Sequence, residues 1–475
     1  MDSIISVGID IGTTTTSMII SKLSFKNTAV SYMVPKVDIT NKKIIYRSNI
    51  YETPVIDSKH LDGKGIRAIV AYEYENAGIT PDQVDSGAVI ITGESLLKDN
   101  ADMIISELSD YAGEFVVATA GPNYESIIAG KGSGVQEFSK DNNCIAANID
   151  IGGGTSNIAI FAYGELVGCT SLDIGGRLLK YNDDGIITYV SSRLNDLVRE
   201  YGFQLVPGEM RVTTERLRYL TDIMTEILFQ TFIAGEHKLM RIALTKNCEP
   251  FKNLPLVRYF SFSGGVAECI YNQDSDIYKY NDLGVSLAHS IIESSYIKNK
   301  TLLRPKETIS ATVVGAGIYT TSVSGSTITY DNEIFPLKNI PTYFVTEKTE
   351  KSAINGNAED LINVFSMAIK QFGTDCFVLC LKGSPKATYN EICRLAKTLA
   401  YCSDEVMEND TPLIISVRND MAKALGELIS NYMNKRRAII CMDGLEISDG
   451  DYIDIGKPIM NGLTLPVVIK TLIFK

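Results

Sequence analysis

The pattern of apolar and polar positions occurs twice in the chain. Residues 7–20 read VGIDIGTTTTSMII, and residues 147–160 read ANIDIGGGTSNIAI. Each stretch has an apolar run, an Asp, a turn of Gly and Thr, and a second apolar run, which is the pattern of a β-hairpin. We therefore expect two similar units, each built around one such hairpin.

Further apolar runs predict an alternation of strands and helices. Residues 87–92 have the continuous apolar character of a buried parallel strand, and helical spacing follows it at 97–111. Two long amphipathic helices are predicted at 194–201 and 217–228. Towards the end, the strands 377–381, 413–417 and 438–442 alternate with helices and predict a small βαβαβ unit. The fold class is therefore α/β.

The length of 475 residues exceeds one ordinary core and predicts several domains. The polar run at 139–143 marks the first boundary, and the charged stretch at 339–357 has the composition of a linker. We expect one domain at 1–143 and a second at 144–338, whose end returns to the first. After the linker 339–357, an additional α/β domain is expected at 358–475.

Composition narrows the classes of function. Of the residues, 45% are hydrophobic and 21% are charged, and no apolar run is long enough to cross a membrane. A net charge of −12 disfavours binding to nucleic acid, which needs basic surface. Nine scattered cysteines suit a reducing compartment, and three separated histidines disfavour a catalytic triad. We expect a cytoplasmic protein with neither nucleic acid nor membrane as partner.

The hairpin turns have the chemistry of phosphate loops. Glycine lets backbone N–H groups approach a ligand, consecutive N–H groups form an anion-binding concavity, and Thr hydroxyls add donors. The candidate phosphate ligands are Gly12, Thr13, Thr14 and Thr15 in the first turn and Gly152, Gly153, Gly154 and Thr155 in the second. Asp10 and Asp150 precede these turns, where carboxylates are suited to hold Mg²⁺. A purely structural hairpin is the alternative for either turn alone.

Two more glycine sites follow. At 259–268 a strand runs into Gly264 and Gly265, where backbone without side chains can lie against a nucleoside. At 311–317 the small residues around Gly315 allow close packing, as at a domain hinge.

These motifs occur in the order of the phosphate-1, phosphate-2 and adenosine motifs of the actin, sugar kinase and DnaK chaperone superfamily. The segment around Gly315 resembles the second connecting segment, and residues 173–177, DIGGR, resemble the turn after phosphate-2. The resemblance implies an actin-like ATPase fold of two ribonuclease-H-like domains that close on ATP or ADP with Mg²⁺. It implies that the two turns clasp phosphates, that Asp10 and Asp150 organise Mg²⁺, and that Gly264, Gly265 and Gly315 line the nucleotide.

Within that superfamily, nearly the whole chain resembles the EutA family, the reactivating factors of ethanolamine ammonia-lyase. The stretches that carry this resemblance are 3–16, 84–95, 148–157, 323–328 and 450–456. It implies a factor that uses ATP and Mg²⁺ to release damaged cobalamin from the inactivated lyase, so that adenosylcobalamin can rebind. It also implies association with the bacterial ethanolamine-utilisation microcompartment and further metal ligands at Thr92, Glu94 and Glu165.

Two alternative functions stay open on the same fold: a small-molecule kinase and a nucleotide-binding scaffold protein. No motif identifies a substrate pocket with a catalytic base, and no residue matches the water-activating residue of the chaperones. The resemblance implies a slow ATPase that acts as a switch rather than a metabolic enzyme. A homo-oligomer is a further alternative that the sequence does not decide.

Overall fold

The computed structural model describes most of the chain. The described residues are 3–13, 15–27, 37–57, 59–92, 95, 98–109, 111, 116–119, 122–246, 248–252, 254–319, 321–323, 328–330, 334–374, 376–384, 386–408, 410–434, 436–445, 447, 451–458, 462, 464–471.

The first unit is a mixed sheet in the order β3-β2-β1-β5-β6, with the short β4 beside β2. Its strands are β1 (Ser3–Ile11), β2 (Thr15–Asn27), β3 (Val37–Arg47), β4 (Tyr51–Glu52), β5 (Ser86–Ile91) and β6 (Val116–Thr119). The first three strands are antiparallel, and β5 and β6 continue parallel to β1. Helices α1 (Gly63–Ala77) and α2 (Ala101–Ser109) and the 3₁₀ turn η1 (Pro81–Gln83) connect these strands. Alternate residues Val7, Ile9 and Ile11 pack under the helices in one buried cluster.

The second unit repeats this order. Its sheet is β13-β12-β7-β8-β9, in which β7, β8 and β9 are antiparallel and β12 and β13 run parallel to β7. The strands are β7 (Ile145–Ile151), β8 (Ser156–Ala162), β9 (Glu165–Leu172), β12 (Tyr259–Ser263) and β13 (Thr301–Leu303). Between them lie the pair β10 (Leu179–Tyr181) and β11 (Ile187–Val190) and the helices α5 (Ser192–Arg199), α6 (Thr214–Gln230), α7 (Lys238–Ala243), α8 (Gly265–Asn272), α9 (Gly284–Glu293) and α10 (Ser295–Lys298). The predicted repeat of a hairpin-led unit is confirmed.

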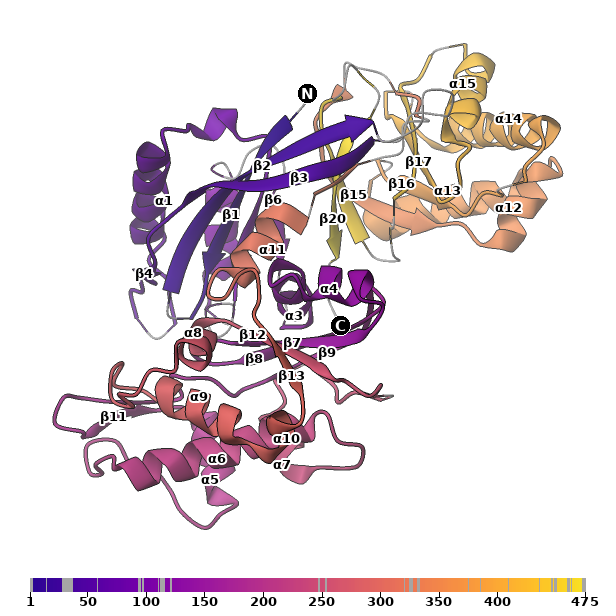
Figure 1. Cartoon of the computed structure of the whole chain (residues 1–475). Coiled ribbons are helices and arrows are strands. Elements are labelled where there is room, and N and C mark those ends of the chain that lie inside the picture. The colour runs from indigo at the N-terminus through magenta and orange to yellow at the C-terminus, as the bar shows by residue number, and fades with distance from the viewer. Residues whose placement is uncertain are drawn as a thin grey trace.

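The two units exchange helices. Helix α3 (Pro122–Gly132), after the last strand of the first unit, packs on β7, β8 and β9, and it is followed by α4 (Val135–Asp141). Helix α11 (Ala311–Tyr319), after the last strand of the second unit, packs on β1, β2 and β5. The two helices contact each other between the sheets (Figure 1). This arrangement of two units with crossed helices is that of the predicted actin-like ATPase fold.

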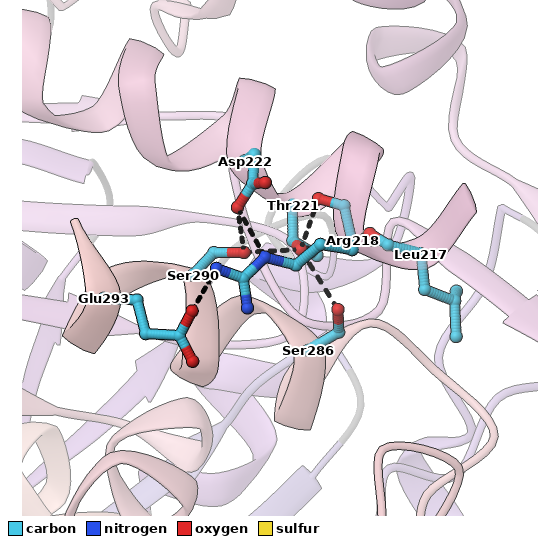
Figure 2. Close-up of polar contacts among 7 residues, drawn as sticks. All are labelled: Leu217, Arg218, Thr221, Asp222, Ser286, Ser290 and Glu293. Atoms are coloured by element: carbon cyan, nitrogen blue, oxygen red, sulfur yellow. Dashed lines mark hydrogen bonds and ion pairs between the residues drawn. The ribbon is translucent and has the colours of Figure 1, made fainter. Parts of the chain in front are cut away.

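Helices α6 and α9 meet through a buried polar contact in the second unit. The hydroxyl of Thr221, on α6, lies 3.1 Å from that of Ser286 and 2.8 Å from that of Ser290, both on α9. At the more exposed edge, the contact is extended by Arg218, Asp222 and Glu293 (Figure 2). Because α9 begins beside the cleft described below, this contact fixes its position against the outer helices.

The C-terminal sheet has the order β14-β20-β19-β15-β16-β17-β18. Its strands are β14 (Thr321–Val323), β15 (Leu337–Phe344), β16 (Val378–Leu381), β17 (Leu413–Val417), β18 (Ile439–Asp443), β19 (Asp451–Ile455) and β20 (Pro466–Thr471). The run β15 to β18 is parallel, and its helices are α12 (Glu347–Ile354), α13 (Glu359–Phe372), α14 (Tyr389–Val406) and α15 (Ala422–Tyr432). In Figure 1 this sheet and its helices lie beside the first unit.

The predicted linker at 339–357 is wrong, and so are the boundaries at 338 and 358. Strand β15 and helix α12 occupy this stretch, and β14 and β15 belong to the C-terminal sheet. The charged residues belong to the exposed side of an amphipathic helix. Glu350 instead is buried, and its carboxylate accepts hydrogen bonds from the backbone N–H groups of Lys382 (3.1 Å) and Gly383 (2.9 Å).

The last strand ties this sheet to the first unit. Strand β20 contacts β6, and Val468 is buried in one cluster with Ala88 and Ile90 of β5, Ile128 of α3 and Ala316 of α11.

Candidate functional site

A cleft of about 460 Å³ lies between the two units. It is lined from the first unit by Asp10, Gly12, Thr13, Thr15, Ile50 and Thr92, and from the second by Asp150, Gly152, Gly153, Gly154, Thr155, Gly176, Arg177, Gly264, Gly265, Glu268, Asn272, Asp274, Lys279, Tyr280, Asp282, Ile309 and Thr312, with Glu125 of α3 between them. The carboxyl ends of β1, β5, β7 and β12 meet here, which is the edge where ligands bind in open α/β sheets.

Hydrogen bonds to Gly12 hold the first turn in place on the side away from the cleft. Within the hairpin, the N–H of Gly12 donates to the carbonyl of Thr15 at 2.8 Å. The carbonyl of Gly12 accepts from the hydroxyls of Thr53 (2.8 Å) and Ser95 (3.0 Å). In a trans peptide the carbonyl and the next N–H point in opposite directions, so the N–H of Thr13 points away from this support. The predicted ligand Thr14 lies outside the described residues.

The second turn has the same geometry with a different support. The N–H of Gly152 donates to the carbonyl of Thr155 at 2.9 Å. The carbonyls of Gly152 and Gly153 accept from the N–H groups of Gly176 (2.9 Å) and Arg177 (2.7 Å). By the same peptide geometry, the N–H groups of Gly153 and Gly154 both point away from that support. Consecutive N–H groups of this kind form a site for an anion.

Asp10 and Asp150 face each other across the cleft. Burial, and then the charge of Asp150, raise the pKa of Asp10 to about 7, against a hydrogen bond from Thr92 at 3.3 Å. Burial raises the pKa of Asp150 to about 6, against hydrogen bonds from Ser263 (2.5 Å) and Thr312 (3.3 Å). Two desolvated carboxylates in one cleft repel each other when both are ionised, and a cation between them relieves that repulsion.

The donor set suits Mg²⁺ rather than a metal held only by protein. Among the described residues there is no group of three or more His, Cys, Asp or Glu that could hold a metal ion. Mg²⁺ is typically bound through one or two carboxylates, with water and ligand phosphates in its other positions. Asp10, Asp150 and the hydroxyl of Thr92 fit this pattern.

The far end of the cleft is built from α8 and the segment before α9. Gly264 has φ of +84°, and a Cβ there would lie 2.4 Å from the carbonyl oxygen of Ile151, so the position requires glycine. The two cations in this part already have partners, since Lys279 pairs with Asp274 at 3.0 Å and Arg177 with Asp282 at 3.4 Å. Gly264 and Gly265 both line this part of the cleft, as the sequence predicts.

Two predicted site residues lie elsewhere. Gly315 packs against α3, where an added Cβ would be 2.0 Å from the carbonyl oxygen of Ile128, so it serves helix packing and does not line the cleft. Glu165 begins β9 and pairs with Ala162 of β8, which in turn pairs with Ile145 of β7. Ile145 is five residues before Asp150, so Glu165 lies at the remote end of the sheet, roughly 16 Å away along the strands at 3.3 Å per residue. Its prediction as a metal ligand is wrong. Glu94 lies outside the described residues.

Sequence reasoning missed several residues that line the cleft or support its lining. Ser263 and Thr312 hold Asp150, and the amide of Asn148, fully buried, donates to the hydroxyl of Ser263 at 2.9 Å. Ser263 directly precedes the predicted glycine pair, which is a signal that could have identified it. Thr312 and Asn148 have no comparable signal, because their roles depend on tertiary contacts.

Comparisons with known proteins identify the family. The family model described as "Ethanolamine utilisation protein EutA" matches residues 2–475. The chain is 34% identical to the ethanolamine ammonia-lyase reactivase EutA of Salmonella typhimurium over 475 residues (99% of this chain, 98% of that protein). It is also 34% identical to that of Escherichia coli over 477 residues (99% and 98%). A solved Aquifex aeolicus PPX-GPPA enzyme has 13% identity and a TM-score of 0.36, over 67% of this chain and 90% of that chain. The chain belongs to the EutA family of ethanolamine utilisation proteins.

Proposed function

We propose that this protein is a reactivating factor for ethanolamine ammonia-lyase that depends on ATP and Mg²⁺. One observation supports this most: two phosphate-loop turns and two facing carboxylates line a single cleft, in a chain of the EutA family. The curated relatives at 34% identity bear the name ethanolamine ammonia-lyase reactivase. In this proposal the protein is a slow ATPase that acts as a switch.

The nucleotide would lie along the cleft. The N–H groups of the two turns, with the hydroxyls of Thr13 and Thr155, would hold the phosphates, and Gly264 and Gly265 would lie against the nucleoside. Asp10 and Asp150, with Thr92, would hold Mg²⁺, which neutralises the phosphate charge when bound. The acidic lining of this cleft supports such an arrangement, because a nucleotide without a cation would be repelled by the two carboxylates.

The switch would be a shift between open and closed arrangements of the two units. A nucleotide that contacts both turns stabilises the closed arrangement, so ATP, ADP and no nucleotide would populate different outer surfaces. A coupling of about 1 to 3 kcal/mol would change the affinity for the lyase roughly 5- to 150-fold. That change would loosen the lyase enough for damaged cobalamin to leave and adenosylcobalamin to rebind.

The proposed partner and location follow from the same reading. The partner is ethanolamine ammonia-lyase, with cobalamin reached only through the lyase, and the location is the cytoplasm with the ethanolamine-utilisation microcompartment. None of the described helices has the length and apolar character that a membrane-spanning helix requires.

The test is recovery of activity by lyase inactivated with cyanocobalamin. Purified protein, adenosylcobalamin and Mg²⁺ are added with ATP, with ADP or without nucleotide. We expect recovery in the mixture with ATP but not in those with ADP or without nucleotide. An Asp150→Ala variant should give no recovery with ATP, because its Mg²⁺ site is lost. Lyase that stays inactive under all conditions, although fresh lyase is active in the same mixture, would contradict the proposal and favour a kinase or a scaffold protein.

A further inference from the structure

An ion pair joins the two units at the rim of the cleft. Arg47 ends β3 of the first unit, and Glu307 lies between β13 and α11. The Arg47 Nη1 atom lies 2.8 Å from Oε2 of Glu307, and Nη2 lies 2.5 Å from Oε1. Two parallel contacts of this kind fix the relative orientation of both side chains, which a single contact does not.

Each partner is anchored in a different unit. Arg47 pairs with Ile19 of β2 in the first sheet. The segment around Glu307 is held on the second unit, because the N–H of Lys306 donates to the carbonyl of Ser133 at 2.9 Å and the N–H of Gly264 donates to the carbonyl of Thr308 at 3.1 Å. The hydroxyl of Thr308 also donates to Glu268 of α8. Relative movement of the two units must therefore stretch or break the Arg47–Glu307 pair.

The pair lies beside the cleft. Ile50 follows Arg47 by three residues, Ile309 follows Glu307 by two, and both isoleucines line the cleft. Their exposed fractions are 49% and 40%, which is high for large aliphatic side chains. The ion pair thus lies next to two exposed apolar side chains, one from each unit, that line the cleft.

We propose that Arg47 and Glu307 form a latch that holds the rim of the cleft and sets how long a nucleotide stays bound. Both are positioning residues, since neither lines the cleft and each acts through the segment it fixes. The identity of the ligand rests on the proposed function, whereas the closure itself does not. Loss of the latch should act mainly on the dissociation rate, as is usual when a contact is lost from an already formed complex.

The test uses charge reversal with rescue. The variants are Arg47→Glu, Glu307→Arg and the double exchange, which restores an ion pair in the opposite sense. The control is Lys306→Glu, one residue before Glu307. Lys306 pairs with Glu137 of α4 at 2.6 Å, and α4 packs on the second sheet, so this pair does not join the two units. Dissociation of ADP carrying a methylanthraniloyl fluorophore, with Mg²⁺, is followed by stopped flow in the full chain.

We expect each single reversal to raise the dissociation rate about two- to fivefold, the range for a partly exposed pair of good geometry. The double exchange should bring the dissociation rate most of the way back to that of the native protein, and Lys306→Glu should leave the rate unchanged. Added salt should speed dissociation from the native protein more than from Arg47→Glu, because salt screens the pair. Equal rates in all variants, or a double exchange no slower than the singles, would overturn the latch.

Hydrogen exchange of the ligand-free protein separates this inference from the proposed function. We expect faster exchange at residues 48–53 and 305–310 in both single reversals and native exchange in the double variant. If the native protein binds no nucleotide, the nucleotide part of the proposed function fails while the latch is still judged by exchange. Unchanged exchange at both segments in the single variants would refute the latch itself.

Discussion

Asp10 and Asp150 face each other across the cleft, where burial and then the charge of Asp150 raise the pKa of Asp10 to about 7. The two residues are the second-last residues of equivalent strands, β1 and β7, of two separate sheets. The repeated hairpin therefore creates, at the junction of its two copies, a pair of acids that neither unit has alone. Several measurable properties depend on that pair.

Mg²⁺ binding should release protons and strengthen as the pH rises. The pKa values are about 7 for Asp10 and about 6 for Asp150, and a cation requires both carboxylates ionised. Between about pH 6 and pH 8, the affinity for Mg²⁺ with ADP should increase, as titration calorimetry in buffers of different ionisation enthalpy can measure. Affinity that does not vary over this range would contradict the arrangement.

The same shift predicts a stability effect without metal. The ordinary pKa of Asp is 3.8, so the folded protein holds the Asp10 proton more tightly than the unfolded chain. The stability that this protonation contributes is fully present in acid and is lost as the pH rises through about 7. At about pH 8, Asp10→Asn should raise the melting temperature by on the order of 2 °C while it removes Mg²⁺ binding. The gain should disappear at about pH 4, where Asp10 is largely protonated.

Ser263 should tune the acidity of Asp150. Its hydroxyl donates to the ionised carboxylate at 2.5 Å and lowers the pKa of Asp150. In Ser263→Ala, the pH midpoint for binding of Mg²⁺ with ADP should move upward by on the order of one pH unit. Ser261→Ala is the control, since Ser261 is equally buried two residues earlier on β12. A role in packing alone would lower stability in both variants without moving the midpoint.

Substitution of two glycines should distinguish an effect on stability from an effect on nucleotide binding. Gly315→Ala forces a methyl group against the carbonyl of Ile128 and should destabilise the protein by about 3 kcal/mol, measured by urea unfolding. Gly154→Ala meets no atom within 4 Å and should change stability by no more than about 0.5 kcal/mol. Its methyl group would lie in the turn between β7 and β8, where we propose that phosphate binds, so nucleotide affinity should fall about tenfold. A stable Gly315→Ala protein would show that α3 and α11 can separate freely.

Glu350 should be structural in the C-terminal sheet. In Glu350→Gln the amide nitrogen cannot accept a hydrogen bond, so one of the N–H groups of Lys382 and Gly383 loses its partner. The expected cost is about 1 to 3 kcal/mol. Glu347→Gln is the matched control, because Glu347 forms an exposed ion pair with Lys382, whose loss should leave the stability nearly unchanged. Thermal unfolding of both variants compares them directly.

The parts of the site that sequence predicted are those with local chemistry. Asp10, Asp150 and the glycines of both turns are recognisable because one short hairpin contains the whole arrangement. The partners of Asp150 come from β12 and α11, far away in sequence, and Ser and Thr are too common to mark such contacts. Glu165 illustrates the opposite error, since register within the hairpin β8–β9 places it at the wrong end of the sheet.

Composition was ambiguous at two further places. The small residues around Gly315 indicated close packing, whereas the resemblance implied a nucleotide contact, and the contact with Ile128 decides for packing. The charged stretch at 339–357 resembled a linker because the exposed side of α12 carries its charged residues, while buried Glu350 has the same residue type as its exposed neighbour Glu347. Burial of a single carboxylate depends on tertiary structure and leaves no trace in composition.

The position of β20 has a consequence for synthesis on the ribosome. Val468 completes a cluster whose other members, from Ala88 to Ala316, are made much earlier. Until residues 466–471 emerge, the face of β5 beside α3 and α11 lacks this cover, although every residue that lines the cleft between the two units has already been translated. The nascent chain would therefore assemble its ligand site before it can shield that apolar face, which makes the last strand the step that ends its exposure to aggregation.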